Sequence, residues 1–236
     1  MMFDDLDDII KTQESGRDTG QNTTQRSGGD DWKKKNKKEW LADKNYQPRD
    51  IDPDMLKRNT NAFTAKGYEV NSATKEIFTE LARKLDELNY TFRAGGDSSN
   101  DLENIFSNNN RNTEYYIPWG NFNKVSDATL KQPTETAYEI AAGVHKLFNE
   151  QKPAVKSFFA REVHQLLGAD LASAVEFLII YTEDGAEKTR ECKRTTGRAS
   201  FMIRLADKAN IPVFNFKNEQ SILRFKSYLT DLITNR

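Results

Sequence analysis

Short apolar runs alternate with longer amphipathic segments over residues 61–236. The apolar runs, which predict strands, lie at 62–65, 90–93, 114–117, 176–181 and 211–215. Between them, apolar residues recur every three or four positions, which predicts helices over 72–88, 101–106, 134–149, 153–168, 199–210 and 219–234. In the first helix, Ile77 and Phe78 are both expected to face the core. Because strands alternate with helices, we expect an α/β protein with a Rossmann-like parallel sheet and helices on both faces.

Residues 1–60 have a different composition. Outside the first ten positions they carry few apolar side chains and many Gln, Asn, Thr, Ser, Gly, Asp and Lys residues. Such a segment cannot bury enough apolar surface to offset the entropy that is lost on ordering. The whole chain is 36% hydrophobic with a mean hydropathy of -0.80, which also favours one domain with a long tail. We therefore predict a disordered tail over 1–60 and one folded domain over 61–236.

Two parts of this tail have the composition of binding segments. In Met1–Ile10, apolar residues fall at helical spacing among four aspartates, which suits either a helix that docks onto a partner protein or a solvated tail. Trp32–Trp40 places five lysines between two tryptophans. Lysines contact a nucleic-acid backbone and indoles stack on bases, so this segment is either a single-strand contact or a lysine-rich linker.

The charge balance and the rare residue types exclude several classes of protein. A net charge of -1 argues against a protein that coats nucleic acid through bulk charge. The lone cysteine, Cys192, excludes an internal disulfide, and we interpret it as a non-catalytic thiol. His145 and His164 lack the spacing of metal ligands, so we predict no metal and no cofactor. No apolar run reaches membrane-spanning length and the N-terminus is acidic, so we expect a soluble, cytoplasmic protein.

Ligands of parallel sheets bind at the carboxyl ends of the strands, where we expect three loops: after Ala65, after Arg93, and between Tyr181 and Ala199. The third loop and the helix after it carry six cations, namely Lys188, Arg190, Lys193, Arg194, Arg198 and Arg204. A loop that leads into a helix exposes backbone N–H groups, so we interpret this one as a phosphate site with an exposed Arg198. In the alternative interpretation, the cations only offset the neighbouring acids Glu183, Asp184, Glu187 and Glu191.

Several segments, in their order along the chain, resemble phage-encoded members of the SLOG superfamily. They are Tyr90–Gly96, Tyr116–Trp119 with Phe122 and Asn123, Ala160 and Arg161 with His164–Gly168, Thr196 and Gly197 with Ile203–Ala206, and Ile211–Asn215. This superfamily joins the DNA-processing protein A group to the LOG phosphoribohydrolases on one Rossmann-like fold. The resemblance covers about residues 62–216. Two glycine-rich loops depart from the family pattern, because Ala65–Glu69 and Thr196–Ser200 keep one glycine each.

The resemblance implies a nucleotide or phosphate site made of residues from these segments: Gly67, Arg93, Gly95, Gly96, Asp101, Trp119, Arg161, Thr196, Gly197, Arg198 and Ser200. Trp119 suits either stacking beside a ligand or core packing. Arg161 either faces the ligand loop or lies on a helix surface, paired with Glu162 or Asp170. If the protein is a LOG-like enzyme, Asp101 and Glu103 would supply the carboxylate near the ribose.

These residues and the resemblance are compatible with three functions. The first is binding of a nucleotide or single-stranded nucleic acid, by analogy with the DNA-processing protein A group. The second is hydrolysis of a nucleoside monophosphate by a LOG-like phosphoribohydrolase. The third is a phage effector or scaffold that docks onto another protein through Met1–Ile10. An oligomer is compatible with all three.

Overall fold

The computed structural model describes residues 44–58 and 60–234. Within them, five parallel strands form one sheet in the order β3-β2-β1-β4-β5. The strands are β1 (Ala62–Gly67), β2 (Thr91–Ala94), β3 (Thr113–Tyr115), β4 (Phe177–Tyr181) and β5 (Val213–Asn215). This arrangement confirms the predicted α/β class. Met1–Ile10 and Trp32–Trp40, which we interpreted as possible binding segments, lie outside the described residues.

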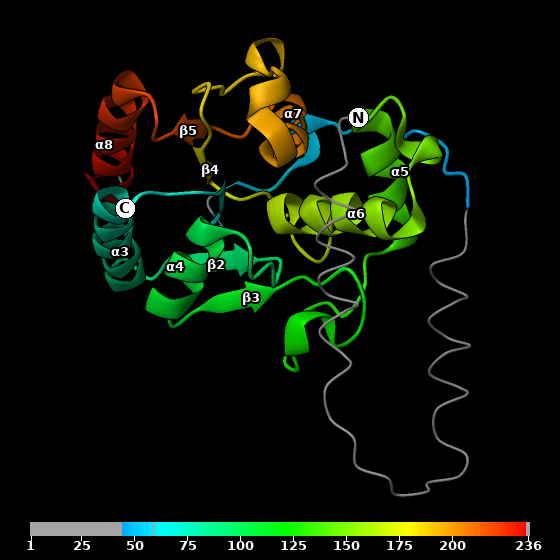
Figure 1. The fold of residues 1–236 in the computed structure, drawn as a ribbon, viewed down its shortest axis with the longest axis horizontal. Coiled ribbons are helices and arrows are strands. Elements are labelled where there is room, and N and C mark those ends of the chain that lie inside the picture. The colour runs from blue at the N-terminus through cyan, green and yellow to red at the C-terminus, as the bar shows by residue number, and fades with distance from the viewer. Residues whose placement is uncertain (1–43, 59, 235–236) are drawn as a thin grey trace, which may run out of the picture.

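Helices cover both faces of the sheet, as predicted (Figure 1). Alternate residues of β4 point to opposite faces, which separates two apolar cores. Phe177 and Ile179 pack with α3 (Ser72–Glu87), α4 (Asp101–Asn109) and α8 (Glu219–Thr234). Leu178 and Ile180 pack with α5 (Glu135–Val144), α6 (Pro153–Leu167) and α7 (Ser200–Lys208). Short 3-10 helices occupy Pro53–Met55, Phe122–Lys124, Phe148–Glu150, Thr189–Glu191 and Arg194–Ala199.

Local sequence signals explain where most helices begin and end. The Asn71 side chain caps α3 by accepting a 3.0 Å hydrogen bond from the Thr74 N–H. Pro153 opens α6 in its first turn, and Gly168, with a φ of 80°, ends it. The predicted helix over 134–149 is too long, because α5 ends at Val144 and a 3-10 turn follows.

Residues 44–58, which we call the strap, lie against α5 and the loop that follows α6, so the prediction of a tail over 1–60 is wrong for this segment. The Tyr46 ring stacks on Tyr138 with a centroid distance of 4.7 Å. The Arg49 N–H donates a 3.0 Å hydrogen bond to the Glu139 carbonyl in α5. Ile51 and Leu56 are partly buried against the core. A few spaced apolar and aromatic residues therefore suffice to order a polar segment when a preformed surface receives them.

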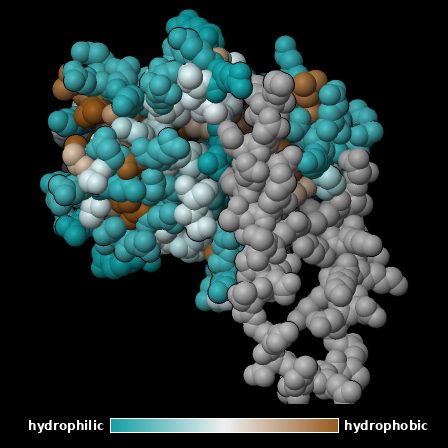
Figure 2. All heavy atoms as spheres, viewed as in Figure 1, coloured by the Kyte–Doolittle hydropathy of each residue, from teal (hydrophilic) through white to brown (hydrophobic). Residues whose placement is uncertain are grey.

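The face in Figure 2 is mostly hydrophilic, with hydrophobic residues gathered in small patches over α8 and α3. The large hydrophobic residues that these two helices expose include Leu223 and Ile77, which is 60% exposed. The expectation that Ile77 faces the core is therefore wrong, whereas Phe78 is fully buried. No helix in the described part of the chain has the length and apolar character to cross a membrane.

Candidate functional site at the switch point of the sheet

The chain reverses its direction across the sheet between β1 and β4, which are hydrogen-bonded neighbours. From β1 it proceeds to β2 and β3 on one side, and then crosses through α5 and α6 to β4 and β5 on the other. In open parallel sheets, ligands bind at the carboxyl ends of the strands that flank such a reversal. The position of the reversal therefore selects the end of β1 as the place to search for a site.

The three loops predicted to meet at this edge are in contact through one side chain. The Arg198 guanidinium, from the basic loop, lies over the Tyr68 ring at 3.9 Å from its centroid. Its Nη1 donates a 3.4 Å hydrogen bond to Ser99 Oγ in the loop after β2. Arg198 is half-buried rather than exposed as expected, because the Tyr68 ring covers one face of its guanidinium.

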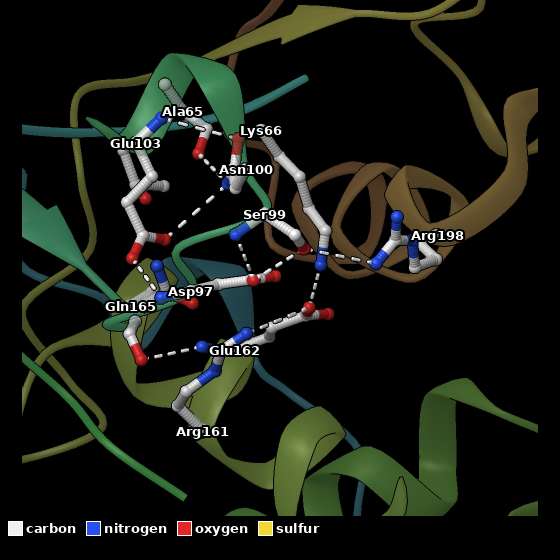
Figure 3. Close-up of polar contacts among 12 residues, drawn as sticks. Ala65, Lys66, Asp97, Ser99, Asn100, Glu103, Arg161, Glu162, Gln165 and Arg198 are labelled. Carbon is white, nitrogen blue, oxygen red and sulfur yellow. Dashed lines mark hydrogen bonds and ion pairs between the residues drawn. The ribbon is translucent and has the colours of Figure 1, made fainter. Parts of the chain in front are cut away.

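Beneath Arg198 lies a group of buried charged residues, drawn in Figure 3. Lys66, at the end of β1, forms an ion pair with Glu162 on α6. Arg161 Nη1 donates a 2.6 Å hydrogen bond to the Gly95 carbonyl, and Nη2 lies 3.7 Å from Glu162 Oε1. All three side chains are at most 5% exposed. This buried position fits the interpretation that Arg161 faces the ligand loop. The alternative, that Arg161 lies on a helix surface, is wrong.

Two atoms of this group have no hydrogen-bond partner among the described residues. They are Arg161 Nε, a donor, and Glu162 Oε2, an acceptor, and both are buried. An unsatisfied buried polar group costs on the order of 1–3 kcal/mol, and more if it is charged. Such groups are therefore rare in folded proteins and mark positions where a ligand or a water molecule completes the hydrogen bonding.

Asp97 contributes a carboxylate to the same place. It accepts hydrogen bonds from the Ser99 N–H at 3.0 Å, from Ser99 Oγ at 2.7 Å and from the Tyr68 hydroxyl at 3.3 Å. Burial by itself would raise the pKa of Asp97, but the Arg161 charge and the Ser99 hydrogen bonds outweigh it and lower the pKa below its ordinary value. Asp97 is therefore ionised at neutral pH. We call Lys66, Tyr68, Asp97, Ser99, Arg161, Glu162 and Arg198 the switch-point cluster.

The two carboxylates proposed for an enzyme do not meet. Glu103 is buried and accepts a 2.6 Å hydrogen bond from the Asp97 N–H, and its burial raises its pKa to about 6. It thereby holds the loop after β2 in place. Asp101 turns instead toward the start of α3, where it accepts from the Val70 N–H at 2.9 Å and from Lys75 at 3.0 Å. Each carboxylate thus stabilises a different loop.

The glycines predicted to admit phosphate are close to the protein's own side chains. A Cβ on Gly95 would collide with the Arg161 guanidinium, and a Cβ on Gly67 would lie within 3.0 Å of Tyr181 and Leu102. Gly96 has a φ of 73° and turns the loop after β2. Gly197 differs from these three, since its Cβ would meet nothing within 4 Å. Of the predicted glycines, Gly197 is the one whose backbone is open to an approaching ligand.

The basic loop divides its residues between two roles. Thr196 is buried and donates to Asp184, while its oxygen accepts a 2.8 Å hydrogen bond from the Lys193 N–H, so it organises the loop. Ser200, the first residue of α7, is half-buried. Some cations of the loop pair with acids, since Lys188 lies 3.5 Å from Asp207. Arg198 instead belongs to the switch-point cluster. Neither the interpretation as a phosphate site nor that of cations offsetting nearby acids therefore applies to every cation of the loop.

Arg93 and Trp119 lie outside the cluster. Arg93 pairs with Glu114 at 3.1 Å and donates to the Ser173 carbonyl at 2.7 Å. The Trp119 ring packs edge-on against Phe122 and Phe158 at centroid distances of 5.1 and 5.3 Å, which is the core-packing alternative. Both residues therefore contribute to contacts within the folded domain rather than to the cluster.

Local hydrogen bonds and burial define the surroundings of His164 and Cys192. His164 is buried between the Thr134 N–H at 3.1 Å and the Gly168 carbonyl at 2.9 Å. Burial raises the pKa of the Cys192 thiol, which opposes formation of the nucleophilic thiolate. No group of three His, Cys, Asp or Glu side chains within the described ranges is arranged to hold a metal ion.

Sequence reasoning missed Lys66, Tyr68, Asp97 and Ser99 as site residues and treated Glu162 only as a partner of Arg161. Lys66 did carry a signal, because it is a charged residue at the end of a strand that is otherwise apolar. Its partner Glu162 lies 96 residues away in the sequence, so no local pattern connects the two.

A cavity of about 540 Å³ lies elsewhere, between the strap, the start of α5 and the loop that leads into β4. It contains no residue of the switch-point cluster. Asp170 at its rim pairs with Lys57 and accepts the Ala172 and Ser173 N–H groups. We assign the candidate site to the cluster, because unpartnered charged atoms converge there and the topology favours that edge of the sheet.

No protein-family model, no curated protein and no solved structure matches the chain.

Proposed function

We propose that this protein binds a phosphate-bearing nucleotide at the switch-point cluster. The observation that carries the proposal is the position of Arg198, which stands where three loops meet, beside the open backbone of Gly197. A guanidinium binds phosphate through two parallel hydrogen bonds. Arg198 has a single 3.4 Å hydrogen bond within the described chain, so most of its donors remain for a ligand.

The charge of the cluster favours a small nucleotide over a nucleic-acid strand. Lys66, Arg161 and Arg198 supply three positive charges, and Asp97 and Glu162 supply two negative ones. Glu103, which accepts from the Asp97 N–H and has a pKa of about 6, adds a third negative charge at neutral pH, so the buried charges nearly balance. A nucleic-acid backbone is bound instead by rows of cations that neutralise successive phosphates.

We also propose that the chain belongs to the SLOG superfamily. The segments that carry the resemblance include β2, the middle of α6, the basic loop with α7, and β5. Two of them contribute residues at or beside the cluster, namely Arg161, and Thr196 and Gly197, which directly precede Arg198. Hydrolysis of a nucleoside monophosphate is the less favoured activity, because Asp101 and Glu103 have separate structural partners.

The test is a binding titration with the four ribonucleoside 5′-monophosphates and with a labelled single-stranded oligonucleotide, each at two salt concentrations. We expect the wild-type protein to bind at least one monophosphate. Arg198→Glu reverses the charge that faces the phosphate and should weaken this binding at least ~10-fold, the loss of one charge-assisted hydrogen bond.

The matched control is Arg190→Glu, which makes the same charge change in the same loop. The Arg190 side chain is 87% exposed and pairs with its neighbour Glu191, so this variant should bind like the wild type. Absence of nucleotide binding by the wild type, or equal affinity in the wild type and Arg198→Glu, would refute the proposal. Tight oligonucleotide binding with a steep salt dependence would replace it with a nucleic-acid function.

A further inference from the structure

The unpartnered atoms of the cluster define what kind of group a ligand brings. Glu162 Oε2 accepts hydrogen bonds and needs a donor, whereas Arg161 Nε is a donor and needs an acceptor. An ionised phosphate offers acceptors alone, and the Glu162 carboxylate repels it. A hydroxyl group suits either atom, because it donates one hydrogen bond and accepts others.

The position of Glu162 relates this hydroxyl to the phosphate. Figure 3 shows the Glu162 carboxylate between the ends of the Lys66 and Arg161 side chains, with the Ser99–Arg198 hydrogen bond drawn beyond the Lys66 amine. In a nucleotide, the sugar is bonded directly to the phosphate, while the base lies beyond it. The sugar hydroxyls are therefore the donors nearest to a phosphate on Arg198.

On the basis of the proposed function, we infer that Glu162, held by Lys66 and Arg161, recognises the ribose hydroxyls of the ligand. The protein then selects ribonucleotides over deoxyribonucleotides. Carboxylates that bind ribose hydroxyls are common in nucleotide-binding α/β proteins. Here the carboxylate comes from the helix α6 rather than from a strand end.

Access to Glu162 requires a small movement. Its Oε2 is buried, whereas Arg198 and the Tyr68 ring on which it stacks are both half-buried. Within the described chain, Arg198 is held in the cluster by one ring face and one long hydrogen bond. A phosphate that binds Arg198 draws it away from Tyr68, which opens the path to Glu162.

The experiment compares each ribonucleoside 5′-monophosphate with its 2′-deoxy and 3′-deoxy forms, on the wild-type protein. We expect at least ~10-fold weaker binding of one or both deoxy forms, as for a lost hydrogen bond to a buried charged group. Equal binding of all three forms would overturn the inference and leave the proposed function standing. Failure to bind any nucleotide would refute the proposed function itself.

Variants then assign the selectivity to Glu162. Glu162→Gln keeps the size of the side chain but removes its charge, and should abolish the preference while a phosphate still binds. Glu135→Gln makes the same change at a side chain that is 65% exposed, and should keep the preference. If Glu162→Gln does not fold, Glu162→Asp retains the charge and should reduce the preference without removing it. A folded Glu162 variant with unchanged selectivity would overturn the assignment.

Discussion

Gly143→Ala tests whether the strap is part of the folded domain, because the two possible answers give opposite signs. Gly143 lies inside α5, where alanine is favoured over glycine by up to about 1 kcal/mol. In the structure, however, a Cβ at this position would lie closer than 3.0 Å to the Arg49 carbonyl oxygen of the strap. Real Cβ atoms do not approach so closely, and the obstacle is backbone rather than a flexible side chain.

The magnitude follows from what the strap would lose. To clear the new Cβ, Arg49 must move away from α5 and give up its 3.0 Å hydrogen bond to Glu139, about 1 kcal/mol. The Tyr46–Tyr138 stack, at 4.7 Å, contributes about 0.5–1.5 kcal/mol more. After the gain in helix propensity, we expect a net destabilisation of about 0.5–1.5 kcal/mol. For a chain of this length, that lowers Tm by roughly 1–6 °C.

Two assays separate these answers. Thermal unfolding by circular dichroism gives the sign of the change, and limited trypsin digestion reports whether Arg49, Lys57 and Arg58 become accessible. Gly120→Ala is the control, because its Cβ would meet nothing within 4 Å, and it should change Tm little. A Tm that rises in Gly143→Ala, with unchanged digestion of the strap, would show that the strap does not pack on α5.

Two further predictions concern the buried charges. Because the pKa of Glu103 is about 6 in the folded protein, above its ordinary 4.5, the folded state binds this proton more readily, and the contribution of Glu103 to stability should rise as the pH falls from 6 to 4.5. Glu103→Gln should remove up to about 2 kcal/mol of this rise in urea unfolding at pH 7 and pH 4.5; parallel profiles would contradict the argument. Lys66→Met removes the closer of the two cations paired with the buried Glu162 carboxylate, which leaves Arg161 at 3.7 Å, and should cost about 3–5 kcal/mol. Lys208→Met removes the exposed pair with Asp50 and should cost less than about 1 kcal/mol, so similar losses in the two variants would refute this role of Lys66.

The sequence predicted the elements well where a periodic pattern was long and its ends were marked. Pro153 and Gly168 bound α6 as predicted, because a proline and a residue with positive φ act on the backbone locally. The prediction for 134–149 was too long, because apolar spacing continued beyond the point where the chain leaves the helix. Ile77 was misplaced for a related reason. Adjacent helical residues lie about 100° apart, so the neighbour of a buried residue often faces solvent.

The alternation of strands and helices by itself determined the α/β class, the parallel sheet and the edge at which its three loops meet. Hydrogen bonding and the handedness of the backbone impose these features on any chain with this pattern. Tertiary structure alone decided the strand order, the position of the strap, and which charged residues face one another. The Lys66–Glu162 pair depends on how α6 lies across β1, and the contact of Arg198 with Tyr68 and Ser99 depends on three loops at once. Local periodicity records which face of an element is apolar, but the partner of a buried charge is set by packing between elements that are distant in the sequence.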